Sequence, residues 1–447
     1  MKYKSMREWM QILEDKGKLK HVNREVSAEF ELAAVGKKAC GEYAVIFDNV
    51  KNNDIPVVTG LTGSREFFSE ALGVPVSELA THFEKAQANP MDCKVISKNS
   101  APVKEYITTD VDLRSLPIPT HHEKDSGAYI TAGILIAKNP VTGERNVSIH
   151  RLQVTDENHL GILILPRHLM HFHRIAEENN QPLEIAIAIG LDPIAMLSSQ
   201  ALTPLGYDEF TIASALYGEP MELVDCETVD LQVPAHAEII LEGHILPNVR
   251  EYEGPFGEYP KYYGPRSKRE LIEITCMTTR EKPIFQTIVP ATDEHLLLGG
   301  IPREGGILKL VKNAVPTVTA VHLTPGGTGR YHLVMQMKKK NEGEAKNAMF
   351  AAFGSSQEIK HVVTVDTDVD IFNPIEVNWA IATRCQASKD VFIVSDACGN
   401  KLDPSTKDGL SDKMGIDATI PLDAPAGKFE KVKIPYEENI NLQDYID

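Results

Sequence analysis

Two glutamates on either side of a short turn are the residues in this sequence best suited to acid–base chemistry. Glu253 and Glu258 flank Gly-Pro-Phe-Gly, a turn that can fold the chain so that both carboxylates face one cavity. Two carboxylates in a water-excluded site do not easily ionise together, so one keeps its proton and can act as a general acid. The same spacing also suits a surface turn with two solvated acids, and spacing alone does not decide between the two interpretations.

The segment 146–151, predicted to be a strand, carries polar side chains at alternate positions. Alternation places Asn146, Ser148 and His150 on one face and Arg151 on the other, apolar face. A polar face by itself indicates only exposure to solvent. A buried guanidinium, however, needs carboxylate partners, and the two glutamates of the turn are candidates.

Three histidines, His168, His171 and His173, follow Pro166 closely and raise the alternative of a metal-dependent hydrolase. Helical spacing puts the first two near one face and the third elsewhere, and the sequence contains no HExxH motif. It also lacks GxxxxGK[ST], and GxGxxG between a strand and a helix. The glycine clusters at 299–300, 305–306 and 326–329 suit loop tips as well as phosphate cradles.

The composition indicates a globular protein of two or three domains. The chain has 447 residues, 42% hydrophobic and 24% charged, with a formal net charge of −17. This charge argues against nucleic acid and anionic membranes as partners, and no apolar run is long enough to span a bilayer. Six scattered cysteines indicate a reducing compartment. The first residues lack a signal-peptide pattern, so we expect a cytoplasmic protein.

The order of predicted elements is α/β, then β-rich, then α/β. The first part has a capping box at Ser5 and Glu8 and a proline-rich boundary at 116–120. The middle part has a hairpin of strands 129–138 and 146–154. In the last part, a strand at 361–365 precedes a helix at 373–384, and we expect an extended tail from Cys398 that packs on a partner subunit. Further strands are expected at 43–47, 56–59, 162–165, 183–189, 238–242, 271–275, 284–288 and 391–394, and helices at 64–72 and 167–178.

Six motifs in this order resemble those of the UbiD family along most of the chain. They are NxSxxR at 146–151, Pro-Arg-His at 166–168, Asp-Glu-Phe at 208–210, EGPFGE at 253–258, WAIATR at 379–384 and KMGIDAT at 413–419. The resemblance implies an α/β (α+β) multidomain fold. Its parts are an N-terminal α/β domain (1–115), a flavin-binding split β-barrel (116–305) and a C-terminal α/β oligomerisation domain with an extended tail (306–447).

The resemblance also implies the cofactors: prenylated FMN, supplied by a flavin prenyltransferase, with Mn²⁺ and K⁺. Asn146, His168 and Glu209 match the metal-binding positions, and Asn, neutral His and carboxylate suit such a cation. The positions that match flavin contacts are Ser148, Arg167, Ser198 and Ser199, with Arg167 in place of the glutamine of some members. Lys360 is a further candidate for contact with the flavin phosphate.

The implied activity is reversible, non-oxidative decarboxylation through a covalent adduct between substrate and prenylated flavin, which acts as an electron sink. Arg151, Glu253 and Glu258 match the catalytic network, in which Glu258 protonates the carbanion and Arg151 orients the carboxylate. Asp293 is a secondary candidate acid. A homo-oligomer, dimer or hexamer, is expected. A non-catalytic assembly protein of the same fold is the alternative, and the presence of all three network residues counts against it.

His295 and Arg303 suggest the substrate class. If the stretch up to Gly299 is helical, a Gly-Gly break could turn Arg303 back toward the far end of the substrate pocket. Both side chains would then pair with a second anionic group, which favours a small-molecule aromatic or heteroaromatic dicarboxylic acid such as a furandicarboxylate. The alternatives are a solvated arginine near a helix end, and a phenolic or pyrrole carboxylic acid as substrate.

Overall fold

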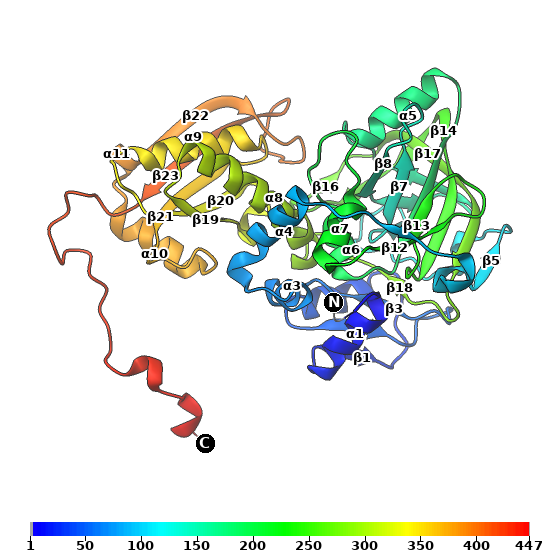
Figure 1. Cartoon of the computed structure of the whole chain (residues 1–447), viewed down its shortest axis with the longest axis horizontal. Helices are drawn as coiled ribbons and strands as arrows, with labels where there is room; N and C mark the ends of the chain where they lie inside the picture. The colour runs from blue at the N-terminus through cyan, green and yellow to red at the C-terminus, as the bar shows by residue number, and fades with distance from the viewer. Residues whose placement is uncertain (1–2, 447) are drawn as a thin grey trace.

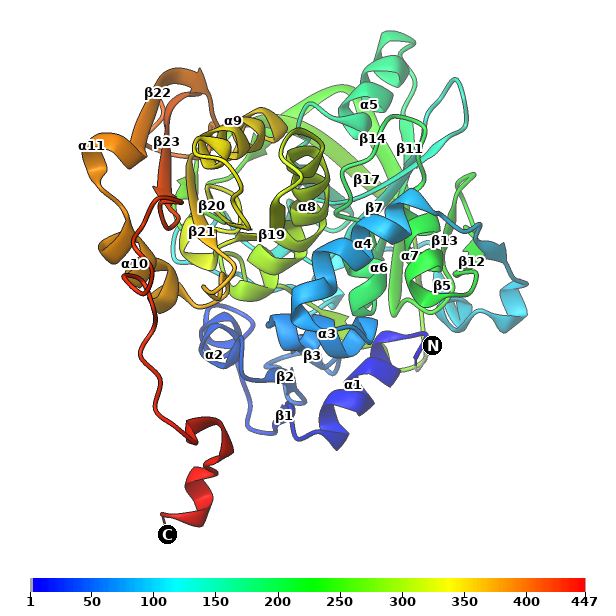
Figure 2. The same ribbon diagram turned by 60° about the vertical axis from the view of Figure 1, so that its left-hand side comes forward.

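The computed structural model describes residues 3–446, which form three parts and a tail. The N-terminal elements lie beneath a large central sheet, and a second, smaller sheet lies beside it (Figure 1). Helix α8 (Asp293–Ala314) lies between the two sheets in both views (Figures 1 and 2). No helix among residues 3–446 is both long and apolar enough to cross a bilayer.

The N-terminal part begins with the predicted capped helix. Ser5 Oγ accepts a hydrogen bond from the Glu8 amide, and Met6, Trp9 and Leu13 of α1 face the core. A four-stranded sheet in the order β1-β2-β3-β18 follows, and its last strand arrives from far along the chain. The elements are α1 (Met6–Asp15), β1 (Leu19–Val22), α2 (Glu31–Ala39), β2 (Ala44–Phe47), β3 (Val57–Thr59), α3 (Arg65–Leu72), α4 (Leu79–Ala88) and β18 (Phe285–Gln286).

The central sheet curls into an open barrel because both of its ends come from one hairpin. Its order is β6-β9-β10-β17-β14-β11-β7-β8, with β5 (Tyr106–Thr108) on β17. Strand β6 continues into β7, and β8 into β9, through two or three residues, so the two ends must lie close together. The strands are β6 (Tyr129–Ile130), β7 (Ile134–Lys138), β8 (Arg145–Ile149), β9 (Leu152–Val154), β10 (His159–Ile162), β11 (Leu183–Ile189), β14 (Ile239–Glu253) and β17 (Ser267–Thr279).

The predicted hairpin therefore forms, but each of its long strands is divided. Strand β7 pairs with β8 and β6 with β9, at opposite ends of the sheet. Arg151 lies in the break between β8 and β9. Its side chain is thus placed by a split in the sheet and not by the alternation of one continuous strand.

The C-terminal sheet has the order β19-β20-β21-β23-β22 and is covered by helices α8, α9 and α10. The predicted tail from Cys398 was wrong, since β23 inserts between β21 and β22 and only residues beyond 418 extend away from the body (Figure 1). The elements are β19 (Val318–Leu323), β20 (His332–Met337), α9 (Glu344–Ser355), β21 (His361–Asp366), α10 (Pro374–Arg384), α11 (Ala387–Asp390), β22 (Val391–Cys398) and β23 (Leu410–Ala418).

The predicted break of α8 at Gly299-Gly300 was also wrong, because the helix is continuous through both residues. Glycines in this helix allow neighbouring segments to approach its backbone closely. A Cβ on Gly299 would lie 1.5 Å from Arg330 Nη2, and one on Gly305 would lie 2.5 Å from the carbonyl oxygen of Ala80. A glycine inside a helix costs about 1 kcal/mol relative to alanine, and these approaches account for it.

Candidate active site

Arg151 holds the two glutamates of the EGPFGE turn together. Its Nε and Nη2 donate to the two carboxylate oxygens of Glu253 at 2.9 and 2.7 Å, and its Nη1 donates to Glu258. Glu253 is 1% exposed and Glu258 9%. The turn is therefore a buried Arg–Glu–Glu cluster, and the interpretation as a surface turn with solvated acids was wrong.

The backbone on both sides of the turn fixes these side chains. Glu253 ends β14, where it pairs with Ser267 of β17. Glu258 lies in the hairpin of β15 (Phe256–Gly257) and β16 (Tyr263–Gly264). A Cβ on Gly264 would lie 3.2 Å from Arg151 Nη1, so glycine there lets the guanidinium reach the turn.

The two glutamates have different electrostatic environments. Burial raises the pKa of Glu258, and the charge of Glu253 adds to this, while Arg151 and the Tyr259 amide oppose it without cancelling it. Glu253 takes two hydrogen bonds from the guanidinium, and the Tyr129 hydroxyl donates to it at 3.2 Å. Glu253 is therefore suited to orienting Arg151, and Glu258 to holding a proton.

Asn146, His168 and Glu209 come together from three elements. Asn146 Nδ2 lies 3.1 Å from Glu209 Oε1 and 3.5 Å from His168 Nδ1. These residues lie on β8, at the start of α5 (His168–Glu178) and at the start of α7 (Glu209–Tyr217). Burial raises the pKa of Glu209 to about 7, although Thr203 donates to it at 2.8 Å. A divalent cation would favour the ionised carboxylate, and an amide oxygen, an imidazole and a carboxylate fit such an ion.

The three clustered histidines do not form a site of their own. His171 is exposed, and His173 is buried on another side of α5, 3.6 Å from Glu177. Among residues 3–446 there is no group of three or more His, Cys, Asp or Glu side chains placed to hold a metal ion. The hydrolase alternative has no support in this geometry.

The candidate flavin contacts are distributed around this region. The Ser148 hydroxyl lies 2.9 Å from His150 Nε2, and Ser198 and Ser199 are buried at the end of α6 (Pro193–Ser198). Arg167 is exposed at the N-terminus of α5. All four remain predictions.

Lys360 has other partners. Its ammonium pairs with Asp403 at 2.8 Å and donates to Ser405 at 2.6 Å, both in the loop before β23. A role at the flavin phosphate remains a prediction. Asp293 is exposed in the first turn of α8, and the structure shows no hydrogen bond or ion pair from it to Arg151, Glu253 or Glu258.

A basic cluster lies next to Tyr259, the residue that follows Glu258. Arg303 donates to Glu358 at 3.2 Å and to the Gly299 carbonyl oxygen at 2.6 Å. Burial and the charge of Arg330 lower the pKa of His295 to about 4, so this imidazole is neutral near pH 7. The Tyr259 ring, directly after Glu258, lies 6.2 Å from the ring of His295. The structure thus brings both predicted substrate-binding residues to one region, although by a continuous helix.

Arg330 is the residue of this cluster that the sequence did not reveal. It is 7% exposed and stacks over Tyr259, and within the described part of the chain its hydrogen bonds go to the carbonyl oxygens of Gly329 and Leu296. Burial lowers its pKa to about 9, and the neighbouring charge of Arg303 contributes. No carboxylate within residues 3–446 forms an ion pair with it. The only sequence signal was the glycine-rich segment just before it.

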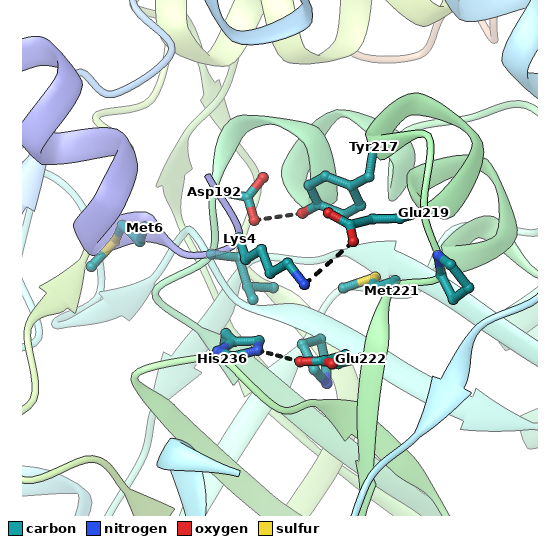
Figure 3. A pocket seen from close by; sticks show the side chains of 11 residues that line it. Lys4, Met6, Asp192, Tyr217, Glu219, Met221, Glu222 and His236 are labelled. Carbon is teal, nitrogen blue, oxygen red and sulfur yellow. Dashed lines mark hydrogen bonds and ion pairs between the residues drawn. The ribbon is translucent and has the colours of Figure 1, made fainter. Parts of the chain in front are cut away.

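The cavity in Figure 3 lies away from these residues, between the N-terminal segment and the end of α7. Its polar side chains are paired with one another. Lys4 lies 3.4 Å from Glu219, His236 lies 2.8 Å from Glu222, and the Tyr217 hydroxyl donates to Asp192 at 2.6 Å. A surface depression with paired polar groups does not have the convergent free donors of a catalytic site.

Comparison with known families agrees with this architecture. Three family models match consecutive parts of the chain: the 3-octaprenyl-4-hydroxybenzoate carboxy-lyase N-terminal domain (10–87), Rift-related domain (94–293) and C-terminal domain (296–418). The chain belongs to the UbiD family. It is accordingly a carboxy-lyase with the mixed α/β fold of UbiD enzymes, and its curled sheet is their split barrel.

Individual UbiD relatives cover nearly the whole chain. The anhydromevalonate phosphate decarboxylase of Methanothermobacter thermautotrophicus is 42% identical over 92% of this chain and 96% of its own. The gallate decarboxylase of Lactiplantibacillus plantarum is 35% identical over 85% and 84%.

The UbiD-class enzyme HmfF from Pelotomaculum thermopropionicum, solved in complex with FMN, superposes with a TM-score of 0.98 at 59% identity over 99% and 100% of the two chains. An evolved dimeric form of that enzyme, with prFMN, gives 0.93 at 55% identity over the same shares of the two chains.

Proposed function

We propose that this chain is a reversible decarboxylase of an aromatic or heteroaromatic acid that carries a second anionic group, with a furandicarboxylate as the leading candidate. The observation that carries the proposal is the excess of positive charge around Glu358, next to Tyr259, the residue that follows Glu258. Arg167, Arg303 and Arg330 all act on one carboxylate, Glu358. Burial raises the pKa of Glu358, but the three guanidinium charges outweigh it and leave the pKa below its usual value. Arg330 is buried and its hydrogen bonds go to carbonyl oxygens, and a buried guanidinium without a carboxylate partner favours binding of an anion.

Each anionic end of the substrate would then be bound by its own group of side chains. Arg151 would orient the carboxylate that leaves as CO2, and Glu258 would deliver the proton to the carbon that loses it. Arg303, Arg330 and neutral His295 would hold the distal anion, with the imidazole donating one hydrogen bond. Binding by both ends positions the reacting carbon against Glu258.

The cofactor would be prenylated FMN, made by a separate flavin prenyltransferase and bound with Mn²⁺ and K⁺. Asn146, His168 and Glu209 would hold the divalent cation, and Ser148, Arg167, Ser198 and Ser199 the flavin. When bound, the flavin supplies an electron sink for the carbanion. This proposal rests on the donor set of the three ligands and on the FMN and prFMN in the solved UbiD-class relative.

A phosphorylated unsaturated acid is the second candidate substrate. The 42% identical relative is named for a phosphate-bearing acid, and a phosphate would suit the same arginines. A monoanionic phenolic or pyrrole acid would leave them without a partner. The arginine cluster therefore argues for a dianion of either class over a phenolic acid.

The test uses protein made together with a flavin prenyltransferase. Absorbance and mass spectra of the released cofactor come first, then CO2 release from furan-2,5-dicarboxylate, 2-furoate, gallate, pyrrole-2-carboxylate and a phosphorylated unsaturated acid. Arg303→Ala should cost the preferred dianion about 2–5 kcal/mol in kcat/KM and spare its monoanionic analogue.

Lys309→Ala is the matched control, since Lys309 lies on the same helix but is exposed and pairs with Glu84. Equal losses on dianion and monoanion in Arg303→Ala would show that Arg303 supports the fold or the flavin and does not recognise the substrate.

A further inference from the structure

Tyr259 connects the candidate proton donor to the C-terminal part of the chain. It directly follows Glu258, and its side chain is 8% exposed. Asn400 Nδ2 donates to its hydroxyl at 2.6 Å, and the Tyr331 hydroxyl lies 3.0 Å away. Asn400 also donates to Glu358 at 2.8 Å. We call these four residues, Tyr259, Tyr331, Glu358 and Asn400, the tyrosine clasp.

The backbone of Tyr259 is joined directly to that of Glu258, within the hairpin of β15 and β16. This hairpin is short, with Glu258 N bonded to the Tyr262 carbonyl oxygen at 2.9 Å. A displacement of the Tyr259 ring would therefore move the backbone that carries the carboxyl group of Glu258.

The other three residues of the clasp flank strands of the C-terminal sheet. Tyr331 precedes β20, Glu358 precedes β21, and Asn400 follows β22. The apolar core around this sheet contains only residues from Ile307 onward, whereas the cores of the N-terminal and central parts end at Ile301. The cores meet along α8, which places Ile301 in one and Ile307 in another. Polar contacts such as the clasp add to this connection.

We propose that Tyr259 is a positioning residue through which contacts with the C-terminal part set the orientation of Glu258. The hydroxyl of Tyr259, held by Asn400 and Tyr331, keeps the hairpin in the conformation in which Glu258 faces the reacting carbon. The inference rests on the proposed role of Glu258.

The phenol ring and the hydroxyl of Tyr259 can be separated by mutation. Tyr259→Phe keeps the ring that contacts Arg330 and His295 and removes only the hydroxyl. Asn400→Ala removes the same hydrogen bond from the other side. Tyr262→Phe is the matched control, because Tyr262 lies in the same hairpin and is 60% exposed.

Cofactor-loaded full-length protein is compared in steady-state assays and solvent deuterium incorporation. Tyr259→Phe and Asn400→Ala should each lower kcat by up to about 10²-fold, the cost of a misplaced reacting group, with little change in KM. The double variant should lose less activity than the product of the two single losses, since both substitutions remove the hydrogen bond between Asn400 and Tyr259. Unchanged kcat, a loss confined to KM, or additive losses in the double variant would each overturn the proposal.

Hydrogen–deuterium exchange separates this inference from the proposed function, because it needs no substrate. Amides of residues 254–266 should exchange faster in Tyr259→Phe and Asn400→Ala than in the wild type and in Tyr262→Phe. If exchange rises but the wild type decarboxylates none of the acids tested, the proposed function fails and the clasp stands as a contact that orders the hairpin. If exchange in this hairpin is unchanged, the clasp is refuted, whatever the activity.

Discussion

Replacing Glu258 by glutamine tests the assignment of the proton donor. The amide has nearly the same shape as the carboxyl group but has no proton to deliver. Positioned general acids contribute on the order of 10²–10⁴ in rate, which corresponds to about 2.7–5.5 kcal/mol of transition-state stabilisation at 1.36 kcal/mol per tenfold. We expect kcat to fall within that range, and solvent deuterium incorporation into the product to fall with it.

The structure predicts that this loss comes without a loss of stability. Arg151 keeps both of its hydrogen bonds to Glu253 in the variant. The pKa of Glu258 in the folded protein is raised above its usual value. The carboxyl group therefore stabilises the fold below its unfolded pKa of about 4.3, and this contribution is lost as the pH rises through the folded pKa. Glutamine removes that loss, so above the pKa of Glu258 in the folded protein the melting temperature of the variant should equal or exceed that of the wild type.

The raised pKa of Glu258 also determines the expected pH profile of activity. A donor with a raised pKa stays protonated to higher pH, so decarboxylation should decline on the alkaline side as Glu258 ionises, and Glu258→Gln should lack this limb. The control is Glu251→Gln, an exposed position on the same strand. A variant of Glu258 that turns over at the wild-type rate would refute the assignment and favour Asp293. Loss of activity with a fall of several degrees in melting temperature would show that Glu258 is structural.

Three further predictions follow from the contacts described. His168→Ala should lose bound Mn²⁺, measured by elemental analysis, and flavin absorbance with it, because a site of three ligands would keep only two; unchanged metal content would exclude this site. Gly299→Ala should lower stability and weaken binding of the dianionic substrate, since the new Cβ would lie 1.5 Å from Arg330 Nη2; a variant with wild-type KM would show that Arg330 does not bind the substrate. Glu304→Ala should cost about 3–5 kcal/mol in the free energy of unfolding measured with denaturant, because it leaves Arg65 buried without its carboxylate; a cost below about 1 kcal/mol would contradict this.

Local patterns in the sequence determined much of the secondary structure. The capping box at Ser5 and Glu8, the turn of the hairpin and the proline at the start of α10 each depend on residues within a few positions. The family and its fold followed from distinctive motifs, above all EGPFGE and KMGIDAT. The grouping of Arg151 with Glu253 and Glu258 could also be predicted, because a buried guanidinium requires carboxylate partners and the three residues match the catalytic network of the UbiD family.

Tertiary structure decided what depends on packing between distant segments. Gly299 and Gly300 predict a helix break locally, yet α8 continues through both. Arg330, some thirty positions away, occupies the space that a Cβ on Gly299 would need. Strand β23 is irregular by composition but becomes a strand because β21 and β22 lie on both sides of it. Arg330 and Asn400 have no motif, since their surroundings come from other elements. Hydrogen-bond partners and burial are properties of the folded chain, and they decide here where positive charge accumulates and what holds Glu258 in place.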